Sequence, residues 1–226
     1  ILLPSLSKAN VDGDKTEYSA LLDWGLRLTF LLALPAAVGM ATLATPLIAT
    51  LFHYGKFTAE SVSMSTQPLV AYSLGLIGII LVKTLAPAFY ARQDIRTPVK
   101  IAIGVLIATQ LMNLLFVPYI AVAGLALSIG LGACLNASFL YWGLRKRGIY
   151  QPKPGWAKFF ARLLPALIVM GGVAYVGAVR IDWIAMQAHP LLRAGALALV
   201  VAVCGVAYFV TLFLVGFRFR DFKRHA

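Results

Sequence analysis

Six apolar stretches of about twenty residues constrain the fold of this chain more than any other feature. At about 1.5 Å of helix per residue, each can cross a hydrocarbon core of about 30 Å. A mean hydropathy of +0.85, with 61% hydrophobic residues, excludes a water-soluble domain. We predict an all-α, polytopic membrane helix bundle with about six transmembrane helices. The stretches lie at roughly residues 28–51, 69–90, 101–120, 121–142, 159–179 and 194–217.

Lysine and arginine gather in alternate segments between these stretches, which predicts the orientation. Sixteen of the 20 cations lie in residues 1–27, 91–100, 143–162 and 216–226, and three lie in 52–68, 117–123 and 179–193. Cation-rich short loops stay in the cytoplasm, so both termini should be cytoplasmic in a bacterial inner membrane. The net charge of +12 then forms rims that meet anionic membrane lipids, and no nucleic-acid partner is expected.

One internal boundary is predicted where prolines and glycines interrupt the helical pattern between Arg145 and Trp156. It separates residues 1–147, which hold the end of one span and four complete spans, from a final helix pair in 148–226. The chain begins at Ile1 and its first four residues look like the tail of a further span. We therefore expect a fragment of a longer protein.

The acidic stretch from residue 10 to residue 24 has two interpretations. Asp14 followed by Glu17 fits a helix N-cap with a carboxylate three residues later, which would start a short surface helix. The alternative is a solvated connector.

Lys83 is the candidate functional residue, because it is the one cation in the interior of a stretch. A lone cation at that depth costs on the order of 3 kcal/mol on insertion scales. The ammonium could snorkel to the nearer headgroups, form a structural pair, or face a hydrated cavity. Helical side chains tilt toward the helix N-terminus, and in the predicted orientation this tilt aims Lys83 toward the membrane centre. A cavity role that attracts phosphate or carboxylate is therefore favoured.

Other polar groups within the stretches could line such a cavity or hold helices together. Gln110 and Asn113 share a face, being three residues apart. A small-residue series at steps of four favours close helix packing, and its last member could form a hydrogen bond between helices. The series is Gly124, Ser128, Gly132 and Asn136. No Asp or Glu lies in the middle of a stretch, where a proton or sodium pump would place one.

Motifs of soluble enzymes and metal sites are missing from the sequence. There is no P-loop, His-Glu-x-x-His or Gly-x-Ser-x-Gly pattern. Cys134 and Cys204 lack partners at ligand spacing and are interpreted as packing residues. The histidines, His53, His189 and His225, lie far apart in loops or the tail, and we interpret them as solvated rather than catalytic. No enzyme activity, metal or cofactor is expected.

Residues 85–100, with the sequence LAPAFYARQDIRTPVK, carry a family resemblance. Together with residues 2–7, 52–58 and 125–130, they resemble the MurJ/MviN lipid II flippases of the multidrug/oligosaccharidyl-lipid/polysaccharide exporter superfamily. The resemblance implies the C-terminal lobe and final helix pair of a fourteen-span transporter, with the N-terminal lobe missing. It also places Lys83 in the substrate-binding cationic cavity, and the last two spans along a groove for the undecaprenyl tail. Gln67 and Pro68 depart from relatives that have an arginine there.

The sequence thus favours part of a lipid II flippase, which moves a polyprenyl-pyrophosphate-linked precursor across the membrane by alternating access. Its partners would be lipid II, membrane lipids and the missing lobe. One alternative is an exporter of other lipid-linked oligosaccharides or drugs. Another is a non-transporting scaffold for cell-wall synthesis, in which Lys83 would be dispensable.

Overall fold

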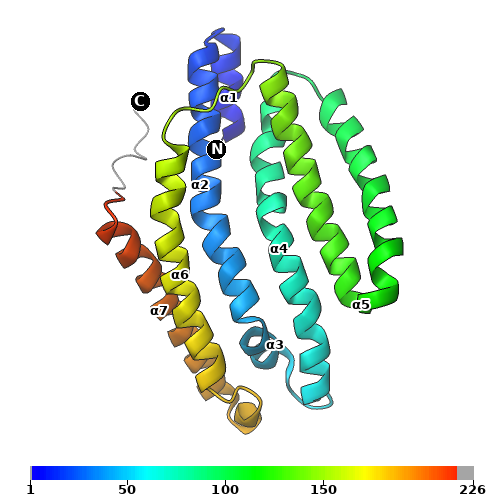
Figure 1. The fold of residues 1–226 in the computed structure, drawn as a ribbon, viewed down its shortest axis with the longest axis vertical. Helices are drawn as coiled ribbons and strands as arrows, with labels where there is room; N and C mark the ends of the chain where they lie inside the picture. The colour runs from blue at the N-terminus through cyan, green and yellow to red at the C-terminus, as the bar shows by residue number, and fades with distance from the viewer. Residues whose placement is uncertain (1, 218–226) are drawn as a thin grey trace. The chain divides into compact units, whose positions relative to one another are not determined.

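A computed structural model describes residues 2–217 of the chain, and these residues form helices joined by short connections, without a strand (Figure 1). The predicted all-α class is confirmed. In chain order the elements are α1 (Leu2–Val11), α2 (Lys15–Thr42), α3 (Ala44–Phe52), α4 (Ala59–Tyr90), α5 (Arg96–Lys146), α6 (Trp156–Arg180), the 3₁₀ turn η1 (Ala185–Ala188) and α7 (Pro190–Leu214). The C-terminal cations from Arg218 onward and His225 lie outside the described residues.

Five of the described helices are long and apolar enough to cross a membrane. One of them, α5, spans 51 residues and would be about 77 Å long if straight, over twice the thickness of a hydrocarbon core. It is two helices joined at a sharp kink, because Ile120 and Ala121 leave helical geometry and Ala121 has φ 44° and ψ −124°. The two halves therefore correspond to the third and fourth predicted stretches, which gives six membrane-crossing segments.

The first predicted span is displaced from the helix that the structure contains. Residues 28–51 were expected to be one span, but α2 covers Lys15–Thr42 and the chain breaks at Leu43 before the short α3. The helix starts early because Asp14 caps it, with Oδ1 accepting the backbone N–H groups of Thr16 and Glu17, each at 2.9 Å. It stops where Pro46 has no N–H to donate to the Thr42 carbonyl. The N-cap interpretation is confirmed, but the helix it starts is long.

The described chain divides into two compact units. Unit 1 contains residues 2–33 and 74–154, and unit 2 contains residues 34–73 and those from 155 onward. The helices α2 and α4 each contribute to both units. The sequence-based boundary between residues 1–147 and 148–226 stays a prediction.

In unit 1, glycines let three helical segments approach closely. A Cβ atom built at Gly75 of α4 would lie 2.0 Å from the Gly130 Cα, and one at Gly132 would lie 2.3 Å from the Thr109 hydroxyl oxygen. Thus Gly132 faces the first half of α5, whereas Gly130 faces α4. The predicted close packing at Gly132 is confirmed, and it brings together the two halves of α5, which form the hairpin seen in Figure 1. The contact through Gly75 was not predicted.

In unit 2, α6 and α7 form a pair and α3 packs against α7. A small core of Ile48, Ala49, Val62, Trp183 and Leu197 joins α3, α4, the turn after α6 and α7. Most outward-facing side chains of α7 are large and apolar, as expected for a helix surrounded by lipid.

Candidate functional site

Lys83 lies on α4, seven residues before its end at Tyr90, which corresponds to about 10 Å along the helix. Its side chain is exposed and makes no ion pair or hydrogen bond with any other described residue. The neighbours Leu85 and Phe89, at 1% and 0% exposure, form the buried side of the helix. At 100° per residue, Leu85 is rotated about 200° from Lys83, so Lys83 projects from the opposite side.

The helix that carries Lys83 is fixed to α2 by polar contacts. The hydroxyl groups of Thr29 and Thr84 are 2.7 Å apart, and the Tyr18 hydroxyl donates to the Ala88 carbonyl. On α4, these contacts lie at Thr84 and Ala88, beside the buried residues Leu85 and Phe89. The position of Lys83 along unit 1 is therefore set by neighbouring residues, although its own ammonium is unpaired.

The other predicted polar residues lie on α5. Asn113 Nδ2 donates to Gln110 Oε1 at 3.3 Å, which confirms that the two side chains share a face. Asn113 Oδ1 is buried and accepts no hydrogen bond within the described chain. Asn136 is half-buried and forms no hydrogen bond to a described residue. None of the hydrogen bonds found among residues 2–217 joins these side chains to Lys83.

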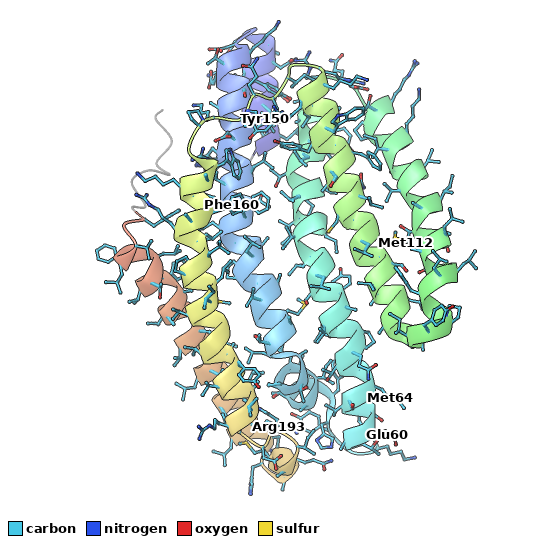
Figure 2. The ribbon with its side chains drawn as sticks, in the orientation of Figure 1. Glu60, Met64, Met112, Tyr150, Phe160 and Arg193 are labelled. Carbon is cyan, nitrogen blue, oxygen red and sulfur yellow. The ribbon has the colours of Figure 1, made fainter. Side chains whose placement is uncertain are left out.

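A buried carboxylate was missed by the sequence interpretation. Asp23 of α2 is 3% exposed, and its Oδ1 accepts the Tyr150 hydroxyl at 2.8 Å and the Lys153 N–H at 3.1 Å. Its Oδ2 pairs with Arg27 Nε at 2.8 Å. Asp23 thereby attaches the segment after α5 to α2 (Tyr150 is labelled in Figure 2). The available signal was the i, i+4 spacing of Asp23 and Arg27 at the edge of an apolar stretch.

A buried cation in unit 2 was also missed, and it corrects the interpretation of His53 as solvated. Arg193, labelled in Figure 2, is 0% exposed and His53 is 3% exposed. Arg193 Nη2 donates to the His53 carbonyl at 3.1 Å, and its guanidinium lies 4.8 Å from the centre of the Tyr54 ring. His53 follows the last residue of α3, so the cation satisfies a helix-terminal carbonyl and is buried by doing so.

The 85–100 block forms the end of α4, a tight turn and the start of α5. In the turn, Gln93 has φ 59°. Asp94 accepts the Thr97 hydroxyl at 2.7 Å and the Thr97 N–H at 3.1 Å, and also pairs with Arg147 at the end of α5. The Thr97 hydrogen bond, with Arg147, holds the pKa of Asp94 below its ordinary value. The block thus connects both ends of the α5 hairpin.

Comparisons with known proteins agree with this fold and with these segments. The family model described as "Lipid II flippase MurJ" matches residues 1–194. The Burkholderia cenocepacia protein "Lipid II flippase MurJ" is 58% identical over 226 residues, covering all of this chain and 44% of that protein. "Probable lipid II flippase MurJ" of Haemophilus influenzae is 37% identical over 225 residues, covering 96% of this chain and 44% of that protein.

A solved structure described as "Lipid II flippase MurJ, inward closed conformation" shares the fold, with a TM-score of 0.77 at 20% sequence identity. The match covers 99% of this chain and 43% of that one. This chain therefore spans less than half the length of the relatives that it matches. Because the family model matches most of its residues, the chain belongs to the lipid II flippase MurJ family.

Proposed function

We propose that this chain works as one part of a lipid II flippase, which moves a polyprenyl-pyrophosphate-linked peptidoglycan precursor across the bacterial inner membrane. The observation that carries the proposal is 58% identity along the whole chain to a protein of that name. No covalent step is involved. A large polar headgroup has to cross hydrocarbon, and a hydrated, cation-bearing cavity lowers the cost while the lipid tail stays in the membrane.

Lys83 supplies the cation in this proposal. Its ammonium is unpaired in the described chain, it projects from the side of α4 opposite the buried residues, and its backbone tilts it away from the nearer helix end. A pyrophosphate is a strong acceptor for such a group. A charge-assisted hydrogen bond contributes about 1.5–3 kcal/mol, which corresponds to roughly a tenfold to hundredfold effect on the step in which it forms.

The test uses a chimera in which this chain replaces its counterpart in the Burkholderia cenocepacia relative. The Lys83→Met chimera should keep its abundance but flip lipid II at least tenfold more slowly, and Lys83→Arg should retain part of the rate because the charge remains. Lys100→Met removes an exposed cation near the start of α5 and is the matched control. Normal flipping by Lys83→Met would refute the role of Lys83 and favour snorkelling.

Activity of the chimera tests the function itself. The chimera should rescue flippase-depleted cells and move lipid II in vesicles, whereas the 226-residue chain alone should do neither, because a cavity between two lobes needs both walls. Movement of another lipid-linked oligosaccharide instead of lipid II would favour the related exporters. Rescue without any lipid movement would favour the scaffold.

Orientation is part of the proposal, with the cation-rich segments and both termini in the cytoplasm. It is supported by the 16 to 3 partition of cations among the segments. In a chain lacking Cys134 and Cys204, cysteines introduced at Lys56 and Gln187 should react with an impermeant thiol reagent in intact spheroplasts. A cysteine at Lys153 should react only after lysis. The reverse pattern would overturn the orientation.

A further inference from the structure

We propose that a cavity at the cation-rich end of unit 1 binds a phosphate group, carried either by an anionic lipid headgroup or by a soluble phosphate. The cavity has a volume of about 250 Å³ and forms where α1, α2, the α4–α5 turn and the end of α5 meet. All of its lining residues belong to unit 1. The polar side chains that line it are those of Asn10, Asp14, Lys15, Tyr18, Arg92 and Arg147.

The charges around this cavity do not balance. Lys15 and Arg92 form no ion pair or side-chain hydrogen bond within residues 2–217. Arg147 is already engaged, because it donates to Asp94 and to the Thr97 hydroxyl, the latter at 2.7 Å. Two unpaired cations therefore face the cavity beside a third, and an anion would relieve their mutual repulsion.

Asp14 is the one carboxylate among the described lining residues, and it is committed to another task. Its Oδ1 accepts the N–H groups of Thr16 and Glu17 at the start of α2. A carboxylate that caps a helix stays close to that backbone. It lowers the positive potential of the cavity but forms no ion pair with Lys15 or Arg92 in the described structure.

The donors and the size of the cavity favour phosphate. Arg92 offers a planar fork of N–H groups that matches two phosphate oxygens, Lys15 offers a compact charge, and the Asn10 amide can donate a further hydrogen bond. The volume is far above the roughly 10–15 Å³ that one water needs. It is also below the range of about 300–1,000 Å³ found for drug-sized ligands. A phosphate group or a small headgroup fits between these limits.

The position of the cavity explains why a lipid is one source of the phosphate. The α1–α2 junction, the α4–α5 turn and the end of α5 all lie at one end of the unit 1 helices (Figure 1). Helix ends of membrane proteins lie at headgroup level, where anionic lipids and soluble phosphates can both reach them. The site lies outside the membrane-spanning part of α4 that carries Lys83, so this inference does not depend on the proposed flippase activity.

The experiment measures binding to the whole 226-residue chain in neutral detergent micelles. Three probes are titrated: dihexanoyl phosphatidylglycerol below its micellar concentration, dihexanoyl glycerol, which lacks phosphate, and inorganic phosphate against chloride at equal ionic strength. The test variant combines Lys15→Gln with Arg92→Gln. The control combines Lys100→Gln with Arg145→Gln, which removes the same charge from exposed residues that do not line the cavity.

At least one phosphate probe should bind the test variant tenfold or more weakly than it binds the control, and dihexanoyl glycerol should not distinguish them. Loss of phosphatidylglycerol binding alone would identify a lipid headgroup, whereas loss of inorganic phosphate binding would identify a soluble source. Equal affinities of the two variants, or no binding of either phosphate probe to the unmodified chain, would overturn the proposal.

A second measurement needs no variant and covers the case in which the test variant fails to fold. The effective phosphate probe should slow modification of Arg92 by phenylglyoxal at least fivefold, as followed by mass spectrometry, while Arg145 reacts at an unchanged rate. Equal rates at Arg92 with and without the probe would refute the site.

Discussion

Asp23 gives the sharpest test of how unit 1 is held together. Its carboxylate is almost fully buried and accepts hydrogen bonds from Tyr150, Lys153 and Arg27. Two of these come from the segment that follows α5, about 130 residues later in the chain. Changing Asp23 should therefore release that segment from α2.

The magnitudes follow from what each variant leaves unpaired. Asp23→Ala removes the acceptor for all three buried or half-buried donors and should lower the free energy of unfolding by about 3–5 kcal/mol. Tyr150→Phe removes one hydroxyl bonded to a carboxylate and should cost about 1.5–3 kcal/mol. Asp23→Asn keeps an acceptor for Tyr150 and Lys153 but loses the ion pair with Arg27. Because the Arg27 side chain is 23% exposed, that loss should be about 1 kcal/mol or less.

The assay is equilibrium unfolding of the purified chain in mixed micelles, followed by far-ultraviolet circular dichroism. A double-mutant cycle isolates the Asp23–Tyr150 bond: adding Tyr150→Phe to Asp23→Ala should cost almost nothing further, which gives a coupling energy of about 1.5–3 kcal/mol. Additive effects of the two substitutions would refute the hydrogen bond as the source of stability. An Asp23→Ala variant within about 0.5 kcal/mol of the unmodified chain would refute the buried carboxylate as an anchor.

Three other regions make separate predictions, each checked by the same unfolding assay. Gly75→Leu should lower the free energy of unfolding by about 1–3 kcal/mol, because even a Cβ there would overlap the backbone of α5. Gly104→Leu is the control and should change it little, since nothing lies within 4 Å of its Cβ position. Equal losses of stability in the two variants would contradict this packing. Because the pKa of Asp94 is lowered in the folded chain, its ionised carboxylate contributes to stability above the ordinary carboxyl pKa near 4. That contribution is lost as the pH falls through the lower folded value, so the free energy of unfolding should decline below about pH 4. Arg147→Gln should reduce that decline, by about 1 kcal/mol or less because the pair is exposed, and an unchanged pH profile would argue against the contribution of the pair. Arg193→Ala should lower the free energy of unfolding by about 3–5 kcal/mol, because it leaves a cavity and a helix-terminal carbonyl without its donor. Limited proteolysis of this variant should then cut first between α6 and α7. An unchanged cleavage pattern would show that Arg193 does not hold α7 to α3.

The sequence alone determined the features that arise from local composition. Apolar runs of about twenty residues require a helical membrane bundle, since only helices satisfy their own backbone hydrogen bonds in lipid. The close packing at Gly132 could also be predicted, because steps of four residues place small side chains on one helix face whatever the partner is. The family followed from the 85–100 block, whose order of residues is specific by itself.

Only the tertiary structure decided which polar residues are buried and what they bind. The sequence left the acidic stretch from residue 10 to residue 24 as either a short surface helix or a solvated connector, and it did not show that Asp23 is buried, because the donors to its carboxylate lie 127 and 130 residues later. His53 read as solvated, yet Arg193, 140 residues away, covers it. Hydropathy sums over neighbours in sequence, whereas the cost of burying a polar group depends on partners that folding brings from distant positions. For that reason the membrane-crossing segments were largely predictable from the sequence, whereas the contacts of Asp23 and Arg193 with residues far along the chain were not.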